Sequence, residues 1–115
     1  MAVIGSVVWG VRDIPRAVEF WSAALDYETK YDPDVDWASL VPRDGQAGIQ
    51  LSLKLTESDG PRRHHLDLFT EDQAGDVARF LELGATTVDD WDYEDDADYV
   101  VLADPDGNTF CLVQT

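Results

Sequence analysis

The feature that most constrains the fold of this sequence is an internal repeat. Asp13 and Asp72 each precede a segment with helical periodicity, and they lie 59 residues apart. Near the end of each half, two matching Asp-Gly turns, at 44–45 and 106–107, are 62 residues apart. The two separations differ because one loop of the second half carries a short insertion. A repeat over half the chain predicts two structural units of the same architecture.

The first half has the pattern of a strand, a helix and further strands. Val3–Val11 is rich in β-branched residues, which predicts a buried strand. Asp13 as an N-cap and Pro15 in the first turn predict an amphipathic helix next. Two more strands are expected after an irregular acidic stretch; they cover residues 37–41 and 49–55. Alternation in the second of these places Gln50 and Ser52 on the same face.

The second half repeats this order. Residues 64–69 predict a strand, Asp72 predicts a second N-cap, and Gly84 predicts the end of a shorter helix. Another acidic stretch precedes the last two expected strands, which cover residues 99–103 and 109–114. Each half therefore consists of a strand, a helix and two or three strands. This predicts an α+β protein made of duplicated βαβββ modules.

Length and composition favour a single globular domain over residues 1–115. The modules are expected at about 1–57 and 62–115, because turn-forming residues cluster from Glu57 to Pro61. Apolar residues make up 44% of the chain, yet no apolar run is long enough to span a membrane. The lone cysteine excludes an internal disulfide. The N-terminal segment lacks the basic region of a signal peptide, so we expect a cytoplasmic protein.

The charge balance limits the possible partners. The formal net charge is −16, from 24 acidic and 8 basic residues. An acidic surface repels phosphate backbones and anionic lipids, so neither nucleic acid nor a membrane is an expected partner. Long-range attraction would instead favour a cationic ligand.

Three segments carry a resemblance to a known family. They are Val8-Trp9-Gly10-Val11-Arg12-Asp13-Ile14 with the helix that follows, His65-Leu66-Asp67-Leu68, and Leu102-Ala103-Asp104-Pro105-Asp106-Gly107-Asn108-Thr109-Phe110-Cys111-Leu112. Together with the repeat, they resemble the vicinal oxygen chelate superfamily of glyoxalases, bleomycin resistance proteins and extradiol dioxygenases. The chain is most similar to its small actinobacterial-type glyoxalase-like domains.

The resemblance implies a structure and a type of site. The two modules would form a curled mixed sheet around a cavity, with the helices outside. Enzymes of the superfamily hold a divalent metal in that cavity through four ligands, two on the first and two on the last strands of the modules. The metal then acts as a Lewis acid on a chelating substrate. The resemblance also implies a homodimer.

This sequence departs from that ligand pattern. The positions implied on the first strands hold Ser6 and His65, and one position implied on the last strands holds Cys111. The fourth falls on Gln50 or Ser52. Serine is a poor ligand for a divalent metal, so no complete metal site is expected, although His65 and Cys111 remain residual candidates. The alternative is that both are ordinary core or cavity residues.

His65 and Asp67 are the candidate catalytic residues. They lie two residues apart on a predicted strand and therefore share a face, where a carboxylate can orient an imidazole as a general base. A structural hydrogen bond is the alternative. The predicted cavity lining is Ser6, Val8, Gln50, Ser52, His65, Asp67, Phe69 and Cys111.

Other residues are given structural roles. His64 points to the face opposite His65, and Trp9 and Trp21 are expected in the core. Arg62 and Arg63 are expected to form an ion-paired surface, the alternative being that they attract an anionic ligand.

Three functional hypotheses remain open. The favoured one is a glyoxalase-like protein that binds a small organic ligand in the cavity between its two modules, without a complete metal site; a divalent metal is the one cofactor considered. The alternative is a metal-dependent lyase, isomerase or dioxygenase with an atypical ligand set. The third is a metal-free enzyme that uses His65 and Asp67 for proton transfer. Whether any reaction is catalysed is not decided by the sequence.

Overall fold

The computed structural model describes residues 1–60 and 62–115. Pro61, the last residue of the predicted boundary segment, lies outside the described residues. The chain divides into two compact units, which we call the first unit (Ser6–His64) and the second unit (Met1–Gly5 with His65–Thr115). No helix among the described residues is long and apolar enough to cross a membrane.

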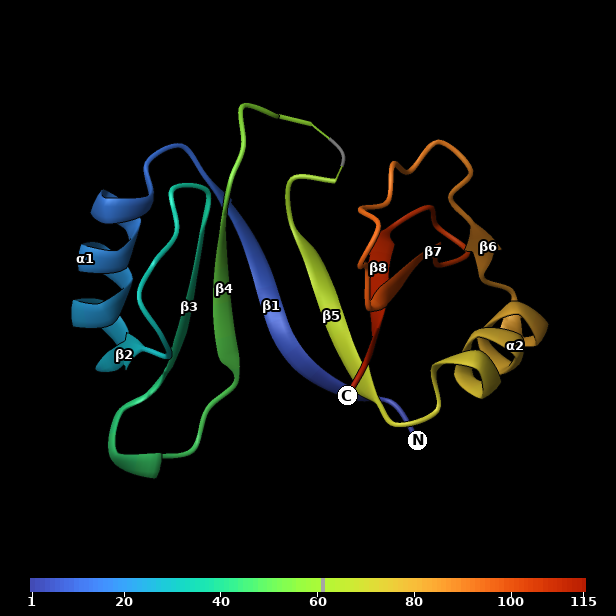
Figure 1. Ribbon diagram of the computed structural model, residues 1–115, viewed down its shortest axis with the longest axis horizontal. Coiled ribbons are helices and arrows are strands. Elements are labelled where there is room, and N and C mark those ends of the chain that lie inside the picture. Colours follow the sequence, from blue (N-terminus) through green and yellow to red (C-terminus); the bar gives the residue numbers. More distant parts are fainter. Residues whose placement is uncertain (61) are drawn as a thin grey trace. The chain divides into compact units, whose positions relative to one another are not determined.

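The first unit contains a helix and a mixed sheet. Its elements are β1 (Val3–Val11, which begins in the second unit), α1 (Ile14–Leu25), β2 (Tyr27–Thr29), β3 (Trp37–Pro42), a 3-10 turn (Arg43–Gly45) and β4 (Gln50–Leu55). The strand order is β2-β3-β4-β1, in which only β4 and β1 run parallel. Figure 1 shows α1 alongside β2 and β3.

The core of the first unit lies between α1 and one face of its sheet. Leu40 and Leu53 are fully buried there against Ile14 and Ala17 of the helix. The helix begins where predicted, because the Asp13 carboxylate accepts a hydrogen bond from the Arg16 backbone N–H at 2.9 Å. The opposite face of the sheet carries the alternating polar residues of β4.

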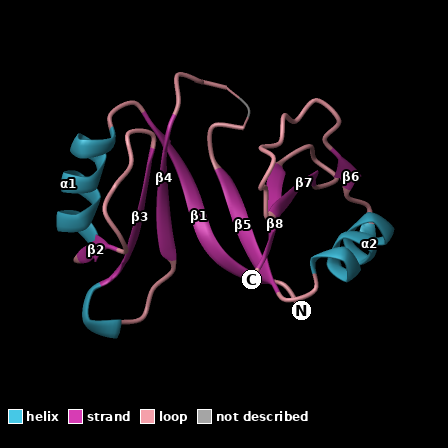
Figure 2. Cartoon of the chain, viewed as in Figure 1, coloured by secondary structure: helices cyan, strands magenta, loops and turns pink. Residues whose placement is uncertain are grey.

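The second unit repeats this architecture. Its elements are β5 (His65–Thr70), α2 (Gln73–Leu83), β6 (Thr86–Thr87), β7 (Tyr99–Ala103) and β8 (Thr109–Gln114). β5 and β8 run parallel, whereas β7 is antiparallel to both β8 and β6. Helix α2 packs on β7 and β8, where Leu102 and Leu112 are fully buried. Figure 2 shows that β6 and β7 are joined by a long loop.

The predicted α+β class and the duplicated order of elements are confirmed. Both helix starts are also confirmed, since Asp72 caps α2 as Asp13 caps α1. Gly84 ends α2 in the left-handed conformation, with φ of 114°. Each unit has three strands after its helix, because β2 and β6 add short strands that the sequence pattern did not resolve.

Candidate functional site

Three chemically active side chains meet on one face of the second unit. His65 and Asp67 lie on β5, and Asp67 is paired in register with Cys111 on the neighbouring β8. The His65 Nε2 is 3.4 Å from a carboxylate oxygen of Asp67. One imidazole nitrogen, one carboxylate oxygen and the Cys111 sulfur all lie within 4.8 Å of one another. The predicted catalytic pair is therefore in contact, and a thiol lies beside it.

Alternation along the strands explains why these polar groups share a face. The residues between them, Leu66 on β5 and Phe110 and Leu112 on β8, take the opposite face. Phe110 contacts Phe80 of α2, with ring centroids 5.6 Å apart. The apolar residues of β8 thus face the helix, which leaves the other face of the strands for His65, Asp67 and Cys111.

Aromatic side chains flank this trio on the same face. Phe69 follows two residues after Asp67, and its ring covers Gly5, which leaves no room for a Cβ there. Tyr99 lies on β7 two residues before Val101, the register partner of Cys111, and therefore shares the face of Cys111. Its hydroxyl donates a hydrogen bond to the Glu94 carboxylate at 2.9 Å. Burial, assisted by the Glu94 carboxylate, raises the pKa of Tyr99. Tyr99 therefore stays a neutral hydrogen-bonding group at neutral pH.

The trio fits the chemistry of a divalent metal ligand set. Imidazole, carboxylate and thiolate all bind Zn²⁺ and Fe²⁺, and the 3.4 Å spacing of His65 and Asp67 suits two ligands of one ion. His65 and Cys111 were the residual candidates from the sequence. The sequence pattern predicts Asp67 as a catalytic partner of His65 and as a lining residue, and not as a metal ligand. Its two-residue spacing from His65 was the signal that it also shares their face.

The first unit holds different residues at the corresponding positions. Ser52 is paired with Val8 as Cys111 is paired with Asp67, and both pairs are related by the offset of 59. This register assigns Ser52, rather than Gln50, to the position equivalent to Cys111. Ser6 stands at the position of His65. No thiol, imidazole or carboxylate occupies these positions in the first unit.

Ser6 and Ser52 of the first unit are hydrogen-bonded to each other. Their hydroxyl oxygens are 2.6 Å apart, and both residues are essentially inaccessible to solvent. Gln50 donates a further hydrogen bond to the Ser52 hydroxyl at 3.3 Å and receives one from Lys30. This face is therefore a satisfied hydrogen-bond network rather than a set of metal ligands.

The predicted lining residues fall into two groups of four. His65, Asp67, Phe69 and Cys111 share one face of the second unit. Ser6, Val8, Gln50 and Ser52 share one face of the first unit. The sequence did not identify Tyr99, although its position two residues before Val101, the register partner of Cys111, follows from strand alternation.

The comparison with protein families decides where this chain belongs. Residues 6–113 match the glyoxalase-like domain family. The chain belongs to this family. The resemblance to the vicinal oxygen chelate superfamily that the three sequence segments carried is confirmed. A search of curated proteins finds no match to this glyoxalase-like sequence.

Several solved structures share the fold of this glyoxalase-like chain. A glyoxalase/bleomycin resistance protein/dioxygenase superfamily member from Vibrio splendidus 12B01 is 16% identical, with a TM-score of 0.67 and 100% coverage of both chains. Methylmalonyl-CoA epimerase from Mycobacterium tuberculosis is 20% identical, with a TM-score of 0.63 over 96% of this chain and 85% of that chain. A hypothetical protein from Bacillus halodurans C-125 is 14% identical, with a TM-score of 0.71 over 97% and 93%. At these identities the likeness concerns the fold alone.

Proposed function

We propose that this glyoxalase-like protein binds a small organic ligand on the face of the second unit that carries His65, Asp67, Phe69 and Cys111. The observation that supports this most is the contact of 3.4 Å between the His65 imidazole and the Asp67 carboxylate. Their side chains are 10% and 16% exposed, so the pair is mostly withdrawn from solvent. A buried polar pair that still reaches solvent is suited to hydrogen-bond a ligand.

The charges on this face favour a cationic or neutral aromatic ligand. The strands β5, β7 and β8 contain no Lys or Arg. Asp67 and Glu94 supply negative charge, and Phe69 and Tyr99 supply flat apolar surface. A planar cation would find stacking partners and a counter-charge together. The net charge of −16 adds long-range attraction.

The proposed binding function does not depend on a complete superfamily metal site. Ser6 and Ser52 are hydrogen-bonded to each other at 2.6 Å and lack the donor chemistry of metal ligands.

We also propose a homodimer, which sedimentation analysis of the purified protein would test. A monomer at all accessible concentrations would reject that part alone.

A ligand screen tests the binding function. The protein is screened by thermal shift against small planar cations and neutral aromatic compounds, and hits are titrated by calorimetry. The chain has two histidines, so His64→Gln is a matched control for His65→Gln. We expect His65→Gln to weaken a genuine hit about tenfold or more, the usual effect of losing a buried polar contact. Equal affinities for both variants would contradict the proposed site.

A second candidate function is favoured by the cluster itself. His65, Asp67 and Cys111 would hold a divalent metal, since their ligand atoms lie within 4.8 Å of one another. A bound metal would supply Lewis-acid chemistry to a lyase, isomerase or dioxygenase of the superfamily. In either function, Asp67 orients the imidazole.

Cobalt distinguishes the two candidates. Co²⁺ bound through Cys111 gives a thiolate charge-transfer absorption that is visible without any assay of activity. If the second candidate is right, this absorption is saturable, disappears in Cys111→Ser and His65→Gln, and persists in His64→Gln. Absence of the absorption at millimolar Co²⁺ rejects the metal site and leaves the organic-ligand proposal standing.

A further inference from the structure

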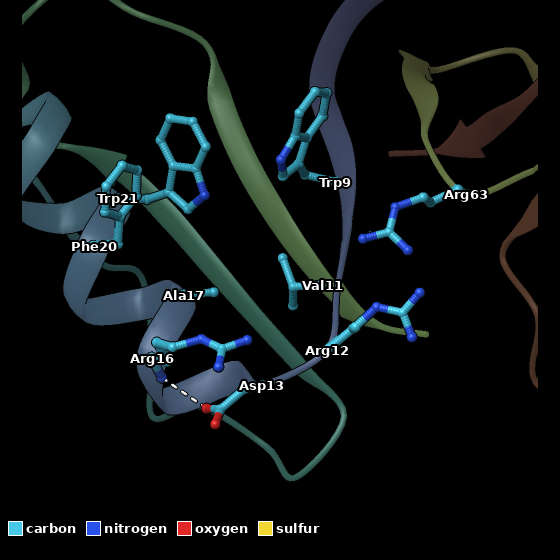
Figure 3. A pocket seen from close by; sticks show the side chains of 10 residues that line it. Trp9, Val11, Arg12, Asp13, Arg16, Ala17, Phe20, Trp21 and Arg63 are labelled. Atoms are coloured by element: carbon cyan, nitrogen blue, oxygen red, sulfur yellow. Dashed lines mark hydrogen bonds between the residues drawn. The ribbon is translucent and has the colours of Figure 1, made fainter. Parts of the chain in front are cut away.

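A concave site lies on the helix side of the first unit, away from the polar face of its sheet. It is a pocket of about 350 Å³ between β1, the first two turns of α1 and the segment that precedes β5. This volume is within the range of small-molecule sites. Figure 3 shows its lining, which combines aromatic rings with three arginine side chains.

Two tryptophans form an aromatic corner in this pocket. The rings of Trp9 and Trp21 meet at 83°, with centroids 6.4 Å apart. Phe20 extends the apolar wall and is 61% exposed. The core position expected for Trp9 was wrong, because this side chain is 37% exposed. Trp21 also packs partly against the core of the first unit, so the corner is anchored there while Trp9 presents exposed apolar surface to a ligand.

His64 fixes the position of Trp9 from the other side. The imidazole stacks on the indole at 3.9 Å between centroids and 7° between planes. Its Nδ1 accepts a hydrogen bond from the Gly10 N–H at 3.0 Å. The stack thus occupies one face of Trp9 and holds the ring rigid, so the corner is formed before a ligand arrives.

The pocket concentrates positive charge in an otherwise acidic chain. Arg12, Arg16 and Arg63 are three of only eight basic residues, and all three line it. In Figure 3, Arg12 and Arg63 lie near each other on the β1 side, and Arg16 lies on the α1 side. Convergence of guanidinium groups beside aromatic rings is typical of carboxylate recognition.

The acidic neighbours of these arginines lie mostly outside the pocket. Arg12 pairs with Glu57 and Asp59, whose side chains are 93% and 84% exposed, and Arg63 also approaches Asp59. These surface pairs hold the two arginines in place at little energetic gain.

Arg16 is the arginine best placed to bind an anion. Asp13 lines the pocket, but its carboxylate is used to cap the Arg16 backbone N–H. Within residues 1–60 and 62–115, the Arg16 guanidinium forms no ion pair.

From this arrangement we infer that the pocket binds a planar aromatic carboxylate. The ring lies against the corner of Trp9 and Trp21, and the carboxylate is bound by Arg16, with Arg12 and Arg63 adding positive potential. This site has the opposite charge preference to the proposed His65 face and lies entirely within the first unit. The inference therefore stands or falls independently of the proposed function.

The test uses a matched pair of probes. 2-Naphthoate is titrated into ¹⁵N-labelled full-length protein, and the four tryptophan indole N–H signals are followed by NMR. 2-Naphthamide has the same ring without the charge. We expect 2-naphthoate to shift the Trp9 and Trp21 signals saturably, leaving Trp37 and Trp91 unchanged, and to bind about tenfold more tightly than the amide.

Two variants of equal charge complete the test. Arg16→Gln removes a pocket arginine that forms no ion pair with the described residues, so the fold should tolerate it. Arg43→Gln removes an arginine of the same unit that pairs with Asp26 and Glu28 outside the pocket. We expect Arg16→Gln to weaken 2-naphthoate binding about tenfold and Arg43→Gln to change it less than about twofold. Equal binding of both probes, equal effects of both variants, or shifts confined to Trp37 and Trp91 would overturn the inference.

Discussion

The side chains of His65 and Asp67 project from the same face of β5, and the imidazole Nε2 lies 3.4 Å from a carboxylate oxygen of Asp67. In the proposed function, this contact lets Asp67 orient the ring and place a negative charge beside it. Cys111 is the register partner of Asp67, so the same carboxylate also neighbours a thiol. Asp67 thus neighbours both of the other members of the trio, His65 and Cys111.

Asp67→Asn should weaken the binding of a cationic hit by about tenfold or more. The amide keeps the size of the side chain but removes the counter-charge, and a lost charge-assisted contact commonly has this effect. Calorimetry measures the affinity. Asp96→Asn, in the exposed acidic loop of the same unit, removes the same charge elsewhere. A similar loss in both variants would assign the effect to net charge alone.

Removing one of the two paired hydroxyls in the first unit should destabilise the fold. Ser6→Ala or Ser52→Ala each breaks the 2.6 Å contact in a fully buried place, which costs about 1–2 kcal/mol. Because the two changes remove the same bond, the double variant should lose less than the sum. Urea unfolding measures each value. Additive losses would show that the hydroxyls stabilise the unit separately.

The Thr70–Asp76 hydrogen bond should make stability depend on pH. The Thr70 hydroxyl donates to the buried Asp76 carboxylate at 2.6 Å, and this bond is the main reason the pKa of Asp76 is lowered. A lowered carboxyl pKa stabilises the fold above the ordinary value of about 4, and the stabilisation is lost as the pH falls through the lowered pKa.

Thr70→Val is the variant that exposes this dependence. It should be less stable than the wild type at pH 7, and the difference should shrink on acidification toward pH 3. Unfolding by urea at a series of pH values measures it, with Thr86→Val on exposed β6 as the control. A difference that is constant across the series would contradict the assignment to the ionised carboxylate.

His64 should titrate below its ordinary pKa of 6.5. Burial disfavours the charged imidazole, and the positive charge of Arg63 lowers the pKa further. The bond from Gly10 to Nδ1 requires the neutral ring, so the Trp9–His64 stack is stable above the ordinary pKa and weakens as the pH falls through the lowered one.

The NMR titration of His64 gives the check. The His64 ring signal and the Trp9 indole N–H signal should share one midpoint below 6.5, and Arg63→Gln should move it upward. A midpoint at or above the ordinary value would contradict the neutral, hydrogen-bonded ring.

The sequence predicted most of the fold because local signals agreed with the repeat. Capping aspartates, alternation and Asp-Gly turns located both helices and the longer strands. β2 and β6 were not resolved individually, since three and two residues are too few to carry a period. Trp9 was expected in the core only because side chains alternate between the two faces of a strand. Alternation predicts which face a residue occupies and not how deeply it is buried.

The sites were only partly predictable, because they depend on register between strands. Alternation correctly placed His65 and Asp67 together. The equivalence of Ser52 with Cys111 required the pairing of β4 with β1, which a single sequence does not contain. The arginine pocket joins β1, α1 and the segment before β5, and no local pattern brings these together.

The most direct test of the account is NMR of protein labelled at the histidine ring carbons, titrated with a hit from the cationic and aromatic screen. The chain has only two histidines: His65 lies on the proposed ligand face, and His64 stacks on Trp9. The account predicts that the His65 signal shifts saturably while the His64 signal stays constant, and that His65→Gln loses the binding. Hits that shift only His64, or that bind without moving His65, would contradict it.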